Sequence, residues 1–261
     1  MKIEGKRYIG KNGYIPLING YSDLKLLNFG ILRLRKGRRY RAILKNRETA
    51  LVVLSGRIDL KCDRYRWASI GRRKDVFSGR AFALYVPPGF EYEIFAITDS
   101  EIAICSAPGN IKSVPRLIRP LDIRLRNVGK DNFRRKVYDI VDERIEAQTL
   151  LVGETINAPG NWSSYPPHKH DRDNLPEESD LEELYFFKLY PPDGFGVIRI
   201  YDRRKMDKIY VIRNNDVVTI PEGYHPVGVI PGYKIYYLWA LAGKKRIMKP
   251  RDDPEYAWVK K

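Results

Sequence analysis

The three histidines of this chain stand in two short motifs that could bind a metal ion. His168 and His170 belong to SSYPPHKHDRD, and His225 belongs to PEGYHPV. Side chains two positions apart on a β-strand share a face, so His168 and His170 would project together and Lys169 would point away. Three imidazoles and a carboxylate suit a divalent transition metal, and ligand type does not choose among Zn, Mn, Fe, Co and Ni. An H-x-H pair alone is a weak signal, and the alternative is two solvated histidines and a third histidine at a turn.

Two adjacent glutamates, Glu182 and Glu183 in LEELYFFKLYPPDG, are candidates for the carboxylate ligand. On a strand, Glu183 would share a face with Tyr185 and Phe187, and Glu182 would lie on the opposite face. We favour Glu183 because it takes the place of Glu48 in an internal repeat. Glu182 is then a neighbouring or surface carboxylate.

The elements that would position these residues are short runs rich in Val, Ile, Tyr and Phe, separated by Gly, Pro and Asp. Their spacing of about 8 to 12 residues is typical of an all-β sandwich or barrel. A faint repeat relates ETALVVLSG and VPPGFEY to ELYFFKLYPPDG and IPEGYHP. The last compared position of the turn is Glu91 in the first half and His225 in the second. We therefore expect two related β units, residues 1–120 and 121–261, with a metal site in the second unit only.

Other strand residues are candidates for contact with a substrate. Val197, Arg199 and Tyr201 would share one face of the stretch FGVIRIYD. If that face lines the site, Arg199 could hold a carboxylate in a bidentate way; the alternative is a surface arginine on an edge strand. Tyr237, in YKIYYLWALAG, is a further aromatic residue that could reach the site.

The composition limits the partners. Among the 261 residues, 48 Lys and Arg against 32 Asp and Glu give a net charge of +16, which attracts anions. The basic residues are dispersed and form no nucleic-acid motif, so we expect a small anionic substrate and no specific nucleic-acid partner. Exposed strand edges and many aromatic residues favour a homo-oligomer.

The location of the protein is predicted from what the sequence lacks. Cys62 and Cys105 are too few for a disulfide framework, and we expect both to be buried in a reducing compartment. No apolar run approaches the roughly 18 residues of a membrane span. The opening MKIEGKRYIG has no signal-peptide stretch, so we expect a soluble, cytoplasmic protein without membrane contact.

Long segments of the chain resemble the bacterial and archaeal 5-deoxy-glucuronate isomerase family of the cupin superfamily. The most specific are GNWSSYPPHKHD, LEELYFFKLYPPDGFGVIRIYD and DVVTIPEGYHPVGVIPGYKIYYLWALAG; LSGRIDL, GRRKDVFSG, ALYVPPG and DPEYAWV extend the resemblance over most of the chain. The resemblance implies a bicupin, with two antiparallel jelly-roll barrels, of which the N-terminal one is degenerate and carries no metal. The family's ligand pattern falls on His168, His170, Glu183 and His225. One departure is Tyr256 in DPEYAWV, where we would expect histidine.

The resemblance also implies a reaction, the step of inositol catabolism that converts 5-deoxy-D-glucuronate into 2-deoxy-5-keto-D-gluconate. Such an isomerisation moves a proton between adjacent carbons through an enediol, which a metal ion stabilises as a Lewis acid. Because all three histidines are assigned to the metal, the base must be a carboxylate, a tyrosine, a lysine or a hydroxide on the metal. The candidates, which we do not rank, are Glu182, Tyr185, Tyr201 and Tyr237. The alternatives are an isomerase of a 4-deoxy-5-keto-uronate from pectin or alginate breakdown, a non-catalytic sugar-acid-binding protein and an Fe(II) oxygenase.

Overall fold

In the computed structural model, which describes residues 6, 7, 12–20 and 22–260, antiparallel β-strands form nearly all the regular structure of this protein. Two 3₁₀ helices, η1 (Asp131–Phe133) and η2 (Ala257–Lys260), accompany them. Most of the opening stretch MKIEGKRYIG lies outside the described residues. Within the described part, no helix is long and apolar enough to cross a membrane. The all-β architecture predicted from the short apolar runs is confirmed.

Two sheets from the first half of the chain face each other across a core of aliphatic side chains. The first outer sheet has the order β4 (Arg39–Ile43), β9 (Glu91–Ala96), β6 (Ile58–Cys62), β7 (Tyr65–Ile70). The first inner sheet has the order β11 (Arg116–Ile118), β8 (Ala83–Val86), β5 (Arg47–Ser55), β10 (Ser100–Pro108), β3 (Asn28–Leu34), β2 (Gly13–Ile18). Leu51, Val53 and Ile94 belong to the core between these sheets. Cys62 and Cys105 are free and buried, as predicted.

Two sheets from the second half repeat this arrangement. The second inner sheet has the order β1 (Lys6–Arg7), β22 (Asp216–Ile220), β19 (Glu182–Tyr190), β24 (Lys234–Ala242), β14 (Leu150–Asn157), β13 (Arg135–Val141), β12 (Arg124–Val128). The second outer sheet has the order β15 (Trp162–Ser163), β23 (Val227–Val229), β20 (Gly196–Tyr201), β21 (Asp207–Ile212). Two short pairs complete this half: β16 (His168–Lys169) with β25 (Arg251–Asp252), and β17 (Asp171–Asn174) with β18 (Glu178–Asp180). The division of the chain at residue 120 remains a prediction, and β1 departs from it because it pairs with β22 of the second half.

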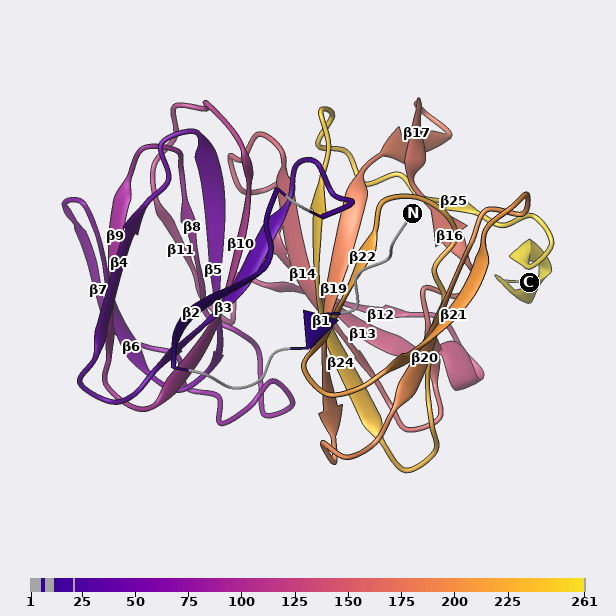
Figure 1. Ribbon diagram of the computed structural model, residues 1–261, viewed down its shortest axis with the longest axis horizontal. Coiled ribbons are helices and arrows are strands. Elements are labelled where there is room, and N and C mark those ends of the chain that lie inside the picture. The colour runs from indigo at the N-terminus through magenta and orange to yellow at the C-terminus, as the bar shows by residue number, and fades with distance from the viewer. Residues whose placement is uncertain (1–5, 8–11, 21, 261) are drawn as a thin grey trace.

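The two inner sheets pack against each other in the middle of the molecule, which gives four layers of sheet (Figure 1). Alternation along β19 divides its side chains between two cores. Leu184 and Phe186 face the first half, and the Phe186 ring centroid lies 5.5 Å from that of Phe29. Tyr185 and Phe187 face the second outer sheet. The site-bearing side of β19 is therefore the side turned away from the first half.

Two glutamates link the halves in a reciprocal way. Glu48 on β5 accepts hydrogen bonds of 2.6 to 2.8 Å from the backbone N–H groups of residues 148–150. Glu182 on β19 accepts hydrogen bonds of 2.6 to 2.8 Å from the backbone N–H groups of residues 25–27. Each carboxylate thus accepts hydrogen bonds from three main-chain N–H groups in the opposite half. Residues 148–150 lead into β14, and residues 25–27 lead into β3.

Strand register corrects the alignment of the internal repeat by one residue. Thr49 pairs with Val86 and Glu183 pairs with Ile220, and a Pro-x-Gly turn follows both partners. Thr49 therefore corresponds to Glu183, and Glu48 corresponds to Glu182. The preference for Glu183 as a ligand rested on its matching Glu48, and that reason is wrong.

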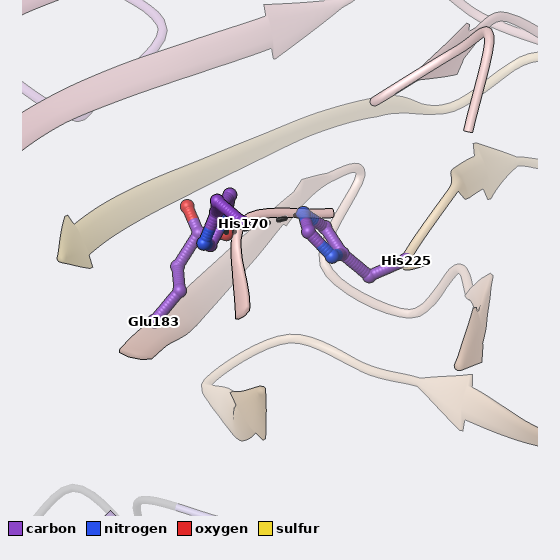
Figure 2. Close-up of side chains that lie close together, drawn as sticks. All are labelled: His170, Glu183 and His225. Carbon is purple, nitrogen blue, oxygen red and sulfur yellow. Dashed lines mark hydrogen bonds and ion pairs between the residues drawn. The ribbon is translucent and has the colours of Figure 1, made fainter. Parts of the chain in front are cut away.

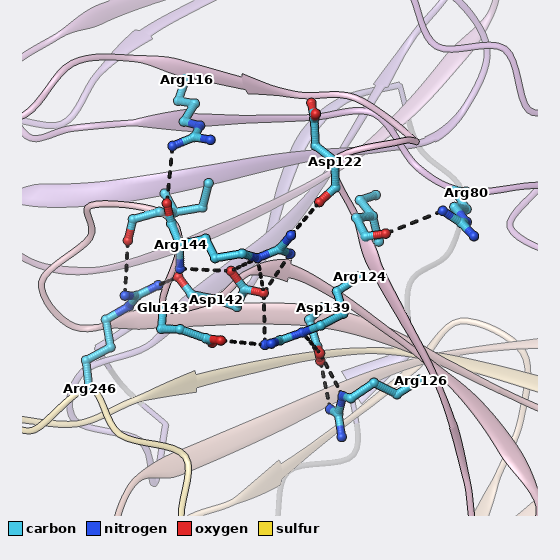
Figure 3. Close-up of polar contacts among 12 residues, drawn as sticks. Arg80, Arg116, Asp122, Arg124, Arg126, Asp139, Asp142, Glu143, Arg144 and Arg246 are labelled. Atoms are coloured by element: carbon cyan, nitrogen blue, oxygen red, sulfur yellow. Dashed lines mark hydrogen bonds and ion pairs between the residues drawn. The ribbon is translucent and has the colours of Figure 1, made fainter.

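A network of arginines and carboxylates surrounds the segment where the chain passes into the second half (Figure 3). Arg124 lies 3.2 Å from the carboxylate of Asp142, and Arg144 donates to the carbonyl of Asp122 at 3.0 Å. Burial alone would raise the pKa of Asp142, but hydrogen bonds from Arg144 lower it instead. Arg246 donates to the carbonyl of residue 150 at 2.7 Å, which ties the C-terminal segment to the same region.

Candidate metal centre

A cavity of about 690 Å³ lies within the second half of the molecule. One wall is the second inner sheet, which contributes Glu183 and Tyr185 from β19 and Tyr237 and Trp239 from β24. His168 and Asp252, which face each other where β16 and β25 pair, also line the cavity. The C-terminal segment therefore forms part of the cavity wall.

His170, Glu183 and His225 converge beside this cavity, and each is buried (Figure 2). One potential ligand atom from each lies within 4.8 Å of the other two. Oε2 of Glu183 is 3.2 Å from Nε2 of His170 and 3.2 Å from Nε2 of His225. The structure thus brings together three residues that span 55 positions of the sequence, from His170 to His225.

The opposite ring nitrogens of the two histidines are held by the backbone. Nδ1 of His170 lies 2.7 Å from the carbonyl oxygen of Leu181, and Nδ1 of His225 lies 2.9 Å from that of Gly223. A carbonyl can only accept, so both Nδ1 atoms are assigned as protonated donors. This arrangement leaves both Nε2 atoms directed at Glu183, which is the orientation that metal-ligating histidines adopt.

The surroundings of Nε2 of His225 show whether a metal ion fits this site. The atom is buried and makes no hydrogen bond of acceptable geometry, although Glu183 is 3.2 Å away. Buried polar atoms are rarely left without a partner, because the cost of desolvation is then not recovered. A divalent cation among these three side chains would satisfy the His225 lone pair and the Glu183 charge together, so the residues fit a metal.

The electrostatics of Glu183 agree with a ligand role. Burial alone would raise the pKa of Glu183, but the hydrogen bond with His170 and the charges of His170 and His225 outweigh it and lower the pKa to about 2. Burial would likewise lower the pKa of His170, but its interaction with Glu183 raises it. Glu183 is therefore ionised at neutral pH and is a poor proton acceptor.

His168 lies beside this group without belonging to it. Its ring centroid is 4.9 Å from that of His225 and 6.3 Å from that of His170. Burial, with the neighbouring His225, lowers the pKa of His168 well below its ordinary value, so the ring is neutral and able to ligate. Lys169 points away, as predicted, and its Nζ lies 2.7 Å from Glu178.

Two of the candidate tyrosines, Tyr185 and Tyr237, line the cavity. Their ring centroids are 4.5 Å apart, and the Tyr185 hydroxyl is 3.1 Å from Oγ of Ser164. Burial and the Glu183 charge raise the pKa of Tyr185 well above its ordinary value, and burial raises the pKa of Tyr237. Both hydroxyls therefore keep their protons at neutral pH.

The other three candidates for contact with substrate lie elsewhere. Glu182 is used by the backbone donors of residues 25–27. The Tyr201 hydroxyl donates to the buried carboxylate of Asp253 at 2.6 Å. Arg199 forms a bidentate ion pair with Asp207 at 2.8 Å on the outer surface, and its guanidinium lies 4.0 Å from the Tyr201 ring centroid.

Arg199 and Tyr201, both on β20, do not reach the site because they lie on the other face of the strand. Ile198 and Ile200 point into the core of the second half, so Arg199 and Tyr201 must point the other way. The apolar pair was a visible signal that the face with the arginine is the outer one. For Glu182, the corresponding reason is that it shares the face of β19 that packs on the first half.

Trp239 and Arg135 are among the lining residues that were not singled out as site residues from the sequence. Trp239 spans the cavity wall over Gly153 on the neighbouring strand, where a Cβ would lie 2.1 Å from Cζ2 of the indole. Arg135 on β13 also lines the cavity, and Val137 on the same face of that strand belongs to the core. The alternation of Arg135, Val137 and Asp139 in RKVYD was a signal for a strand, but the sequence does not say which sheet it joins.

Comparisons with known proteins agree with this architecture. A family model described as the KduI/IolB family matches residues 10–259. A 5-deoxy-glucuronate isomerase of Geobacillus kaustophilus (strain HTA426) is 45% identical over 235 residues, covering 89% of this chain and 85% of that protein. A 5-deoxy-glucuronate isomerase of Bacillus subtilis (strain 168) is 39% identical over 241 residues, covering 91% of this chain and 89% of that protein.

Solved structures extend the comparison to the fold. An IolB-like protein from Salmonella typhimurium LT2 matches with a TM-score of 0.96 and 32% identity, covering 100% of both chains. A mutant of Bacillus subtilis oxalate decarboxylase matches with a TM-score of 0.66 and 13% identity, covering 95% of this chain and 77% of that one, and it shows a likeness of fold alone. The predicted all-β bicupin fold is confirmed, as is the resemblance noted in the sequence motifs. The chain belongs to the KduI/IolB family.

Proposed function

We propose that the protein is a metal-dependent ketol-isomerase that converts 5-deoxy-D-glucuronate into 2-deoxy-5-keto-D-gluconate, a step of inositol catabolism. Relatives that share about two fifths of its residues carry the name 5-deoxy-glucuronate isomerase. The observation that carries the proposal is the buried group His170, Glu183 and His225, with an unpartnered imidazole nitrogen, beside a cavity of about 690 Å³. A cavity of this size accommodates a six-carbon sugar acid.

The metal would be held by His170, Glu183 and His225, with His168 as the fourth ligand. A bound divalent cation supplies Lewis acidity, which stabilises the negative charge that develops on the substrate oxygens during enolisation. The backbone carbonyls of Leu181 and Gly223 fix the two imidazole rings through their Nδ1–H groups. Zn, Mn, Fe, Co and Ni are the candidate ions, because all accept a set of imidazoles and one carboxylate.

Tyr185 and Tyr237 are the protein's proton-holding groups in the cavity. Because burial raises the pKa of both hydroxyls, they act as hydrogen-bond donors to the substrate oxygens and not as bases toward carbon. Tyr185 also contacts Ser164 Oγ at 3.1 Å, so its hydroxyl oxygen can accept a hydrogen bond from the serine while its own O–H donates to the substrate. Such a pair would stabilise the oxygens of the enediol as charge moves between them.

The direct test is a side-by-side assay of substrates with the purified protein, supplied in turn with each of the five metal ions. Proton NMR should show loss of the aldehyde signal of 5-deoxy-glucuronate and formation of the ketone. A 4-deoxy-5-keto-uronate tested under the same conditions should react at least ten times more slowly. Faster reaction of the second substrate, or tight binding of either without conversion, would replace this proposal with one of the alternatives.

A further inference from the structure

The guanidinium group of Arg135 lines the cavity but has no role in binding the metal ion or in the proposed enolisation. Arg135 lies on β13 and lines the same cavity as His168, Glu183 and Tyr237. Its Nη1 donates to the backbone carbonyls of Phe133 at 3.1 Å and Tyr165 at 2.8 Å. These two bonds fix one nitrogen of the guanidinium and involve no negative charge.

No residue that the structure describes places a carboxylate oxygen within 4.0 Å of Arg135; the charge of Asp252 acts on Arg135 only from farther away, and Asp252 is itself paired with Lys260. Burial lowers the pKa of Arg135, which is the effect expected when a cation is desolvated without a partner. A desolvated cation normally pairs with an anion, because its hydration is otherwise lost without compensation. The position of Arg135 therefore calls for an anion from outside the chain.

The other cationic residues that line the cavity are engaged. Arg126 forms a bidentate pair with Asp139, at 2.7 and 2.8 Å (Figure 3). Lys260 forms an ion pair with Asp252, and Lys130 has an interaction of its own. Arg135 is thus the cation in this wall whose charge is best placed to select a ligand.

We propose that Arg135 binds the carboxylate of the substrate, so that the opposite, aldehyde end of the six-carbon chain is directed to His170, Glu183 and His225. This inference rests on the proposed function, because a uronic acid carries its carboxylate and its aldehyde at opposite ends. A guanidinium held by one nitrogen has its remaining N–H donors available, and these match the two oxygens of a carboxylate. The role that the sequence suggested for Arg199 is therefore assigned to Arg135.

The test compares an acidic and a neutral substrate in matched variants of the metal-loaded protein. The substrates are 5-deoxy-glucuronate and 5-deoxy-glucose, which differ in the carboxylate. Arg135→Gln should lower kcat/KM for the acid by about 10- to 150-fold, mostly through KM, because one charge-assisted interaction is lost. The value for the neutral sugar should change by less than about twofold, so the preference for the acid should collapse, and Arg135→Lys should restore part of it.

Arg199→Gln is the control, since Arg199 is paired with Asp207 on the outer surface. It should retain the wild-type preference for the acid. Equal losses on both substrates in Arg135→Gln would show that Arg135 serves only to hold the loop carbonyls of Phe133 and Tyr165, and would overturn the proposal. An unchanged preference would overturn it as well.

A binding measurement separates failure of this inference from failure of the proposed reaction. If the wild-type protein isomerises neither substrate, calorimetry with D-glucuronate and D-glucose as probes still reports on Arg135. Stronger binding of glucuronate than of glucose, lost in Arg135→Gln and kept in Arg199→Gln, would support the carboxylate site alone. Absence of glucuronate binding to the wild type, or equal binding to Arg135→Gln, would overturn it.

Discussion

Glu182→Gln and Glu183→Gln should have opposite effects, although the two residues are adjacent. Glu182 faces the first half of the molecule and accepts three backbone hydrogen bonds of 2.6 to 2.8 Å. Glu183 faces the cavity and contacts two imidazole nitrogens at 3.2 Å. We therefore expect Glu182→Gln to lose stability and keep metal, and Glu183→Gln to keep stability and lose metal.

The size of the stability loss follows from the donors that Glu182 satisfies. Oε1 accepts from residues 26 and 27, and Oε2 accepts from residue 25. A glutamine keeps one acceptor oxygen, but its amide group cannot accept the third bond and its remaining bonds lose their charge. With net values of about 1.5–3 kcal/mol for a bond to a charged group, we expect a loss of about 2–4 kcal/mol. In a chain of this length, that loss corresponds to a fall of roughly 4–16 °C in Tm.

The assay pairs urea unfolding with metal analysis of both variants. Glu182→Gln should contain as much metal as the wild type at a lower unfolding midpoint. Glu183→Gln should bind metal at least about 100-fold more weakly, because it loses a direct ligand. Its metal-free form should be no less stable than the metal-free wild type, since a buried charge is removed. Metal loss in Glu182→Gln together with normal metal in Glu183→Gln would refute the assignment of faces on β19.

Three further substitutions test the other parts of the site and the interface. His225→Ala should reduce bound metal to well below one per chain in elemental analysis; full occupancy would remove His225 from the ligand set. Tyr185→Phe should lower kcat roughly 100-fold with unchanged metal content if its hydroxyl donates to the reacting oxygens, and an unchanged kcat would exclude that role. Arg73 lies 2.6 Å from Glu154 between the halves, with both side chains 2% exposed, so Arg73→Ala should cost about 3–5 kcal/mol in chemical denaturation. A loss below about 1 kcal/mol would mean that water solvates the Glu154 carboxylate once Arg73 is removed.

The sequence predicted the parts of the site that depend on local periodicity. H-x-H spacing placed Lys169 away from its neighbours, and alternation along LEELYFF placed Glu183 with Tyr185 on one face. The Pro-x-Gly turn placed His225 at a turn that leads into the next strand, and β23 begins two residues after it. The fold class could be predicted from the short apolar runs, because a buried β-strand shows this sequence pattern whichever strand it pairs with.

Features that depend on pairing between distant segments could not be predicted in the same way. Alternation showed that Arg199 and Tyr201 share a face, but only the packing of Ile198 and Ile200 shows that this face is outward. The role of Glu182 depends on donors more than 150 positions away, and no local pattern reports such a contact. The repeat was real but misaligned by one residue, which matters in a strand because each shift of one changes the face.

Dependence of turnover on bound metal is the direct test of whether this protein is a metal-dependent isomerase. The protein would be stripped with a chelator and titrated with the metal found in the native sample, and conversion of 5-deoxy-glucuronate would be followed at each point by proton NMR. We expect negligible turnover in the stripped protein and a linear rise that saturates at one metal ion per chain. Full turnover in protein shown to be free of metal would contradict it.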